Sequence, residues 1–326
     1  MRVVLLLVLA AVASGSVISV HSQTAECGQR QVIANVSLRN GSLLRGLRSG
    51  SFVATFRGQP IPVELLEEDR SPRRIAFLVD TGSLDRDVRK TEHHILKTIL
   101  SEARPEESFS LVTVRGIRRQ VPFGVERSAF EPVLMDIANP PRESSRANDL
   151  LPSLKELLST SQLREGDGVI VIARDLDFGE GRFSEVLATL VQRGIRVYAF
   201  QLGPTMAGEY LTFGWSGPFI TLGNESTLRS LAWNSGGYIM VASSWSAQHS
   251  FKFTPERAEL LRIASINSYR AIVQFYRLRI VPPQLKLQED WVLDVVPSIK
   301  DQAKQVILVY PRLLQPCESA RAAKKN

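Results

Sequence analysis

The sequence predicts an α/β fold with a mostly parallel central sheet, and three observations lead to this prediction. Residues 169–173 form a continuous apolar run, as expected for a strand that is buried on both faces of a sheet. Residues 75–79 form a second run of this kind. Around these runs, segments with apolar residues at helical spacing alternate with further short apolar stretches. Such alternation is typical of a parallel sheet whose faces are covered by helices.

The elements of this α/β region are expected in a strict order. Strands are predicted at residues 75–79, 109–114, 117–123, 169–173, 197–202 and 238–241. Helices are predicted at residues 85–103, 127–137, 148–159, 182–192, 227–234 and 255–268. Gly194 and Gly236-Gly237 follow two of these helices, where glycine commonly ends a helix. Asp149 lies near the start of the third helix, where a capping carboxylate is favourable.

The two flanks of this region are predicted to be rich in strands. Before it, strands are expected at residues 32–38, 51–56 and 61–66, with Asn40-Gly41 as a hairpin-type turn. After residue 268 no helix is expected, and strands are predicted at residues 269–281, 291–296 and 305–309. Neither flank is large enough to bury a core alone. The sequence therefore predicts that the N- and C-terminal segments form one β-rich module beside the α/β core.

The first 22 residues have the layout of a secretory signal peptide. Met1-Arg2 is a positive start, residues 3–13 are apolar, and small residues precede an expected cleavage after Ser22. The apolar run is short for a membrane span, although an uncleaved anchor is the alternative. The mature chain is expected to begin at Gln23 and to be secreted or periplasmic. Three formal glycosylation sequons begin at Asn35, Asn40 and Asn224.

The charge of the chain limits the classes of partner. A formal net charge of +7 favours weak attraction to acidic surfaces. No block of basic residues is interleaved with aromatic ones, so nucleic-acid binding is not expected. The basic tail, residues 318–326, is interpreted as a solvated end. No feature of the sequence indicates a particular oligomeric state.

The two cysteines, Cys27 and Cys317, lie near opposite ends of the mature chain. In an exported protein such a pair can form a disulfide, and two unpaired thiols are the alternative. If the β-rich module joins both ends of the chain, the two side chains are brought close together. We therefore predict that they are bonded.

The motif Asp80-Thr81-Gly82-Ser83 follows the first buried strand. It places a carboxylate where open α/β sheets have their binding crevice. Together with the segments 148–154, 169–175, 194–203 and 228–237, this motif resembles a von Willebrand factor type A (VWA) domain. With its flanks, the chain is similar to the secreted bacterial VWFA-related domain proteins of the acidobacterial type.

The resemblance implies a domain order and a function. It implies a signal peptide at residues 1–22, an N-terminal β segment at 23–73, a Rossmann-like VWA core at 74–268 and a C-terminal β segment at 269–317. It also implies a non-catalytic protein that binds a protein ligand of unknown identity. The binding face would be made by Asp80, Ser83, Asn148, Asp149, Asp175 and Asp177.

VWA domains usually hold Mg²⁺ in this face, and such a hard cation needs several oxygen ligands. Asp80 and Asp175 match the two aspartates of the family's site. However, Gly82 and Leu84 stand where the first loop usually supplies hydroxyl groups, and Arg174 adds a positive charge beside Asp175. We therefore expect a degenerate site without a cofactor and a metal-independent interaction. Binding of Mg²⁺ by an intact site is the alternative.

Two further functions were weighed. The sequence Asp80-Thr81-Gly82-Ser83 also resembles the signature of aspartic proteases, which are built almost wholly from strands and need two aspartates sharing a proton. The chain has no second signature of this type, and a hydrolase using Asp80 and Asp175 would lack a recognisable nucleophile–base pair. An enzyme is therefore not expected. A structural scaffold, in which the α/β core only supports the β flanks, is the other alternative.

Overall fold

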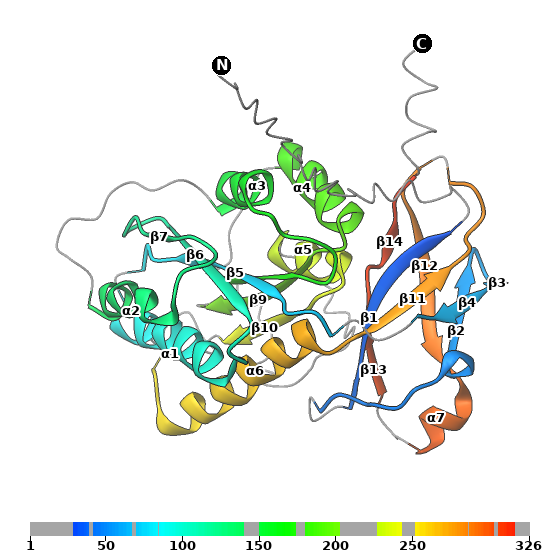
Figure 1. The fold of residues 1–326 in the computed structure, drawn as a ribbon, viewed down its shortest axis with the longest axis horizontal. Coiled ribbons are helices and arrows are strands. Elements are labelled where there is room, and N and C mark those ends of the chain that lie inside the picture. The colour runs from blue at the N-terminus through cyan, green and yellow to red at the C-terminus, as the bar shows by residue number, and fades with distance from the viewer. Residues whose placement is uncertain are drawn as a thin grey trace, which may run out of the picture.

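The structure is a computed structural model. It describes residues 29–38, 42–66, 70–83, 85–139, 150–173, 180–202, 227–242, 252–285, 287–302 and 306–316. Figure 1 shows an α/β core beside a module that consists mainly of strands. In the part of the chain that is described, none of the helices combines the length and apolarity needed to span a membrane.

The α/β core is built on a six-stranded sheet with the order β10-β9-β8-β5-β6-β7. The four inner pairings are parallel, and only β7 runs antiparallel to its neighbour β6. The strands are β5 (Arg74–Asp80), β6 (Ser108–Val114), β7 (Gln120–Val121), β8 (Gly168–Ala173), β9 (Arg196–Leu202) and β10 (Ile239–Ala242). The predicted α/β fold with a mostly parallel sheet is therefore confirmed.

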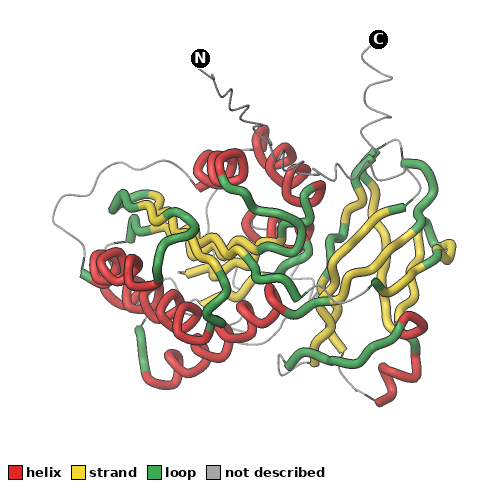
Figure 2. Tube along the Cα trace, viewed as in Figure 1, coloured by secondary structure: helices red, strands yellow, loops and turns green. Residues whose placement is uncertain are grey.

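Helices cover both faces of this sheet, three on each face (Figure 2). The helices on one face are α1 (Arg86–Glu102), α2 (Glu131–Ala138), which continues a 3-10 turn at Arg127–Phe130, and α6 (Pro255–Val273). Those on the other face are α3 (Leu150–Thr160), α4 (Glu180–Gln192) and α5 (Thr227–Ser235). The middle of β5 is apolar throughout because the strand is buried on both faces. Phe77 packs into the core on one face and Leu78 into the core on the other, and both are fully buried.

The flanks form a β-rich module of two packed four-stranded sheets with the orders β13-β1-β11-β4 and β14-β12-β2-β3. Its N-terminal strands are β1 (Arg30–Leu38), β2 (Phe52–Phe56), β3 (Gln59–Ile61) and β4 (Val63–Leu65). Its C-terminal strands are β11 (Tyr276–Ile280), β12 (Glu289–Val295), β13 (Val306–Val309) and β14 (Leu313–Leu314). Each sheet thus contains strands from both ends of the chain, and the two share one core around Phe52 and Trp291.

The structure corrects the predicted strand at residues 61–66. The β2–β3 hairpin turns through Arg57 and Gly58, which both have positive φ angles, as expected for a two-residue hairpin turn. After β3 the chain passes from one sheet to the other at Pro62, and β4 pairs with β11 instead. Proline has no N–H for a sheet ladder, so a break at this position has a simple physical reason.

The structure also corrects the prediction that no helix follows residue 268. Helix α6 continues to Val273, and strand β11 begins only at Tyr276. Because Tyr269, Ala271 and Ile272 are all buried, this short apolar run fits a buried helix turn as well as a strand. A further short helix, α7 (Pro297–Gln302), connects β12 to the last strands, and a 3-10 turn at Ser49–Ser51 precedes β2.

A buried polar network joins the β-rich module to the α/β core. Arg196, at the start of β9, donates to the side chains of Asn35 (2.9 Å) and Tyr198 (2.8 Å). It also donates to the carbonyl oxygens of Ala271 (2.9 Å) and Ile272 (3.0 Å), in the last turn of α6, and more weakly to Gly166. None of these acceptors is a carboxylate. The cation is instead held by the negative end of a helix, where unpaired carbonyls are available.

Asn35 supplies the other half of this network from β1. Its amide nitrogen donates to the carbonyl oxygens of Ala271 (2.9 Å) and Gln274 (2.8 Å), and its oxygen also accepts from the Tyr198 hydroxyl (3.1 Å). Burial raises the pKa of Tyr198 to about 12, so this hydroxyl stays protonated and able to donate. Asn35 is 1% exposed, so in the folded protein the asparagine of this glycosylation sequon makes internal contacts.

Candidate functional site

Asp80 is the last residue of β5, at the carboxyl end of the parallel strands. Its side chain is completely buried, and Oδ1 accepts a hydrogen bond from the backbone N–H of Gly82 at 3.0 Å. The Nε atom of Arg115 lies 3.7 Å from the same oxygen, and the Arg115 side chain is 28% exposed. A buried carboxylate thus faces a guanidinium group that remains accessible from the solvent. Opposite charges at this separation attract each other.

Arg115 is positioned by an unusual turn between β6 and β7. Arg115 has a φ of 52° and Gly116 a φ of 68°, which is the left-handed region. A side chain at Gly116 would bring its Cβ to 2.2 Å from the carbonyl oxygen of Thr81, so only glycine allows this close approach. Left-handed backbone at a residue other than glycine is uncommon and often marks a site where geometry is functionally constrained.

Thr81 ties this turn to the end of β5. Its backbone N–H donates to the carbonyl of Val114 at 2.9 Å, and its hydroxyl oxygen accepts from the N–H of Ile117 at 3.0 Å. The same hydroxyl donates to the backbone carbonyl of Arg115. Thr81 is nearly fully buried, so its hydroxyl is committed to the neighbouring loop. The consequence is that Arg115 and Asp80 are held on one rigid support.

Ser83 belongs to the turn that leads into helix α1. Its hydroxyl oxygen accepts from the N–H of Asp85 at 3.2 Å, and its carbonyl accepts from Nε of Arg89 at 2.7 Å. Asp85 then caps the helix by accepting from the N–H of Asp87 at 2.8 Å. Ser83 is also buried, so the first loop uses its two hydroxyl groups for local structure.

The remaining predicted site residues lie outside the described residues. These are Asn148, Asp149, Asp175 and Asp177, together with Arg174 and the cysteines Cys27 and Cys317. Of the predicted binding face, only Asp80 and Ser83 are described, and both lie at the end of β5, before helix α1.

The residues present in the first loop do not suit a hard divalent cation. Asp80 offers one carboxylate, but Gly82 has no side chain, and the hydroxyl groups of Thr81 and Ser83 bond to neighbouring backbone. Within the described ranges, no group of three or more histidine, cysteine, aspartate or glutamate side chains is placed to hold a metal ion. Arg115 is the neighbour of Asp80 that the sequence did not reveal. The only feature of the sequence that marked its position was an Arg115-Gly116 pair directly after a buried strand.

Several solved structures are similar to this chain. The von Willebrand factor type A protein from Catenulispora acidiphila is 9% identical over 88% of this chain and 74% of that chain, with a TM-score of 0.43. Proximal thread matrix protein 1 from the mussel byssus is 15% identical over 61% of this chain, with a TM-score of 0.40. This chain spans about half the length of the mussel protein, 49% of it.

The conserved hypothetical protein BatB from Bacteroides thetaiotaomicron is also similar. It is 15% identical over 60% of this chain and 98% of that chain, with a TM-score of 0.39. No protein-family model and no curated protein match the sequence. These likenesses concern the fold alone, and the fold described above rests on the order and pairing of the strands themselves.

Proposed function

We propose that the protein is an exported, non-catalytic VWA-like protein that binds a protein ligand without a metal ion. The observation that carries this proposal is the contact between buried Asp80 and Arg115 at the carboxyl end of β5. In this proposal the guanidinium group supplies the positive charge that a divalent cation supplies in an intact VWA site. The face around Asp80 and Ser83 is the binding face, and the leader at residues 1–22 supports export.

Electrostatics favour this substitution of cation by guanidinium. Two unit charges about 4 Å apart interact by about 4 kcal/mol at an effective dielectric constant of 20. The attraction between Arg115 and Asp80 has this order of magnitude, and a divalent cation placed beside Arg115 would be repelled by up to twice as much. Arg115 therefore offsets the attraction that the Asp80 carboxylate would exert on Mg²⁺.

The partly exposed side chain of Arg115 indicates what the ligand offers. Its guanidinium forms a loose ion pair with Asp80 at 3.7 Å, and such a fork of N–H groups pairs well with a carboxylate. The proposed partner is therefore a protein that presents an acidic side chain to this face.

The fold differs from the one that the resemblance to aspartic proteases implies, because those enzymes are built almost wholly from strands. The polar contacts found for Asp80 and Ser83 are with backbone N–H and guanidinium groups.

Calorimetric titration tests the metal-independent part of the proposal. We expect Mg²⁺ and Mn²⁺ to bind with a dissociation constant weaker than about 100 μM, which corresponds to about 5.5 kcal/mol. Tighter binding that disappears in Asp80→Ala would contradict the proposal and establish metal-dependent ligand binding instead.

A comparison of two charge-removing substitutions tests the binding face. Hexaglutamate is used as the acidic probe, in the presence and absence of a chelator. Arg115→Gln should weaken its binding more than Arg118→Gln, which removes the same charge from an exposed position in the same loop. Equal effects of the two substitutions would leave only general attraction by a basic protein and would favour the scaffold alternative.

A further inference from the structure

A cavity of about 130 Å³ lies where the α/β core meets the β-rich module. It is at the opposite end of the central sheet from Asp80, because its walls come from the segments that precede β5 and β8. The residues that line it are Ile33, Ser71, Arg164, Glu165, Phe275 and Arg277. None of them belongs to the binding face proposed above.

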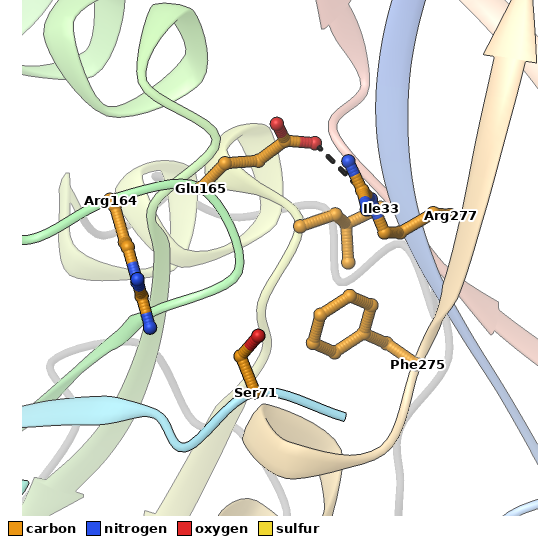
Figure 3. A pocket seen from close by; sticks show the side chains of 6 residues that line it. All are labelled: Ile33, Ser71, Arg164, Glu165, Phe275 and Arg277. Atoms are coloured by element: carbon orange, nitrogen blue, oxygen red, sulfur yellow. Dashed lines mark ion pairs between the residues drawn. The ribbon is translucent and has the colours of Figure 1, made fainter. Parts of the chain in front are cut away.

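The walls of this junction cavity carry both charge and a hydroxyl group. Figure 3 shows Arg164 on one side and Arg277 with Glu165 on the other, with Ser71 and the Phe275 ring between them. Nε of Arg277 lies 3.8 Å from Oε1 of Glu165, which is a loose ion pair. The lining thus has two guanidinium groups and one carboxylate, a net charge of one positive unit.

The apolar part of the lining is the Phe275 ring, and two further cations lie against it. The guanidinium carbon of Arg196 is 4.5 Å from the ring centroid, and that of Arg73 is 4.7 Å from it. Both arginines are only 1% exposed. Gly166 makes this arrangement possible, because a Cβ there would lie 2.9 Å from Cζ of Phe275. The buried carboxylate of Asp167, which accepts from the N–H groups of Arg74 and Arg164, offsets part of this positive charge. The positive charge that remains beneath the ring favours an anion above it.

We propose that the junction cavity binds a carboxylate that is attached to a short apolar group. Arg164 and the Ser71 hydroxyl donate to the carboxylate, and the apolar group packs against Phe275 and Ile33. Glu165 disfavours a second negative charge, so the ligand is a monoanion. A free short-chain carboxylate and the C-terminal residue of a peptide share this chemistry.

Butyrate is the first probe, with butyramide as its neutral counterpart at the same ionic strength. Titration followed by NMR should give saturable binding of butyrate with a dissociation constant on the order of 1 mM, a reasonable affinity for so small a ligand. Arg164→Gln should weaken it at least tenfold. Arg118→Gln, which removes an equal charge from an exposed loop elsewhere, should leave it unchanged.

The two possible sources are separated by a short peptide ending in valine, compared with its C-terminal amide. Tighter binding of the free peptide than of butyrate identifies a peptide C-terminus, and similar or weaker binding identifies a free short-chain carboxylate. Ser71→Ala is the second variant for the butyrate titration, because it removes the proposed hydroxyl donor at an exposed position. The proposal is overturned by the lack of saturable butyrate binding, by equal binding of butyramide, or by an unchanged affinity in Arg164→Gln.

Discussion

Substitution of Asn35 by leucine probes the network that joins the two parts of the protein. Leucine has the same branching and the same number of side-chain heavy atoms as asparagine but offers no hydrogen bonds. Asn35 makes four of them, two as a donor to carbonyl oxygens near the end of α6 and two as an acceptor from Arg196 and Tyr198. The substitution therefore removes polar contacts without opening a large cavity, and its effect reports on the network itself.

The magnitude follows from what each group loses. The bond from the Arg196 guanidinium is charge-assisted and is worth about 1.5–3 kcal/mol, and each neutral bond is worth about 0.5–1.5 kcal/mol. Tyr198 keeps a second acceptor at Ala271, and Ala271 keeps its bond from Arg196, so part of the loss is compensated. We expect Asn35→Leu to lower the free energy of unfolding by about 2–5 kcal/mol, a large share of the about 5–15 kcal/mol typical of a domain.

Urea unfolding, followed by far-UV circular dichroism and tryptophan fluorescence, measures this loss. Trp291 lies in the core of the β-rich module and Trp233 lies in α5 of the α/β core, so fluorescence reports on both parts of the chain. Gln31→Leu is the matched control, because Gln31 lies on the same strand but is exposed. It should change the free energy of unfolding by no more than about 0.5 kcal/mol.

Two outcomes would refute the reasoning. A change of less than about 1 kcal/mol in Asn35→Leu would mean that Arg196 finds other partners without cost. An effect of Gln31→Leu as large as that of Asn35→Leu would show that leucine in β1 is harmful for reasons unrelated to the network. If the two spectroscopic transitions separate only in Asn35→Leu, the network is also what makes the two parts unfold together.

Three further predictions concern the candidate site, pH and the ends of the chain. Gly116→Ala should destabilise the protein by at least about 1 kcal/mol more than Gly124→Ala in thermal unfolding, since both have positive φ but only Gly116 is sterically crowded. Burial lowers the pKa of His93 in the folded protein. As the pH falls below about 6.5, His93 is therefore protonated in the unfolded chain before it is protonated in the folded one, and the free energy of unfolding decreases. The decrease in melting temperature from about pH 7.5 to about pH 5.5 should therefore be smaller in His93→Gln, and an identical decrease would count against this assignment. Finally, intact-mass measurement of the denatured, non-reduced protein should find no alkylatable thiol if Cys27 and Cys317 are bonded, and two such thiols would exclude the bond.

The features that could be predicted from the sequence are those that depend on a pattern of apolar residues. The runs at β5 and β8 are apolar because both faces of the sheet are covered, and together with the alternation of strands and helices they indicated a parallel α/β core. Asp80 could be placed because a carboxylate directly after such a strand lies at the crevice. The end of α6 could not be placed, because a run that is buried on all sides has no period to read.

The partner of Asp80 was beyond the sequence for a different reason. Arg115 follows β6, and only the parallel pairing of β5 with β6 brings the two residues together. The left-handed turn at Arg115 and Gly116 is likewise a response to the carbonyl of Thr81. Contacts of this kind depend on the tertiary fold, whereas composition and spacing describe only the chain itself.

The pairing of β1 with strands from the far end of the chain has a consequence for folding. During synthesis β1 emerges early, but its neighbours β11 and β13 are made last, as the bond from Arg277 to Gln31, 246 residues earlier, illustrates. Val36 and Leu38 can pair early with Leu44 and Ser42, which follow directly. The other backbone groups along the edges of β1 stay unpaired until β11 and β13 are made and are a template for pairing with other chains. A nascent chain of this protein therefore completes its β-rich module late, and contacts this far apart in sequence slow folding. Loss of the last strands alone would expose the first one.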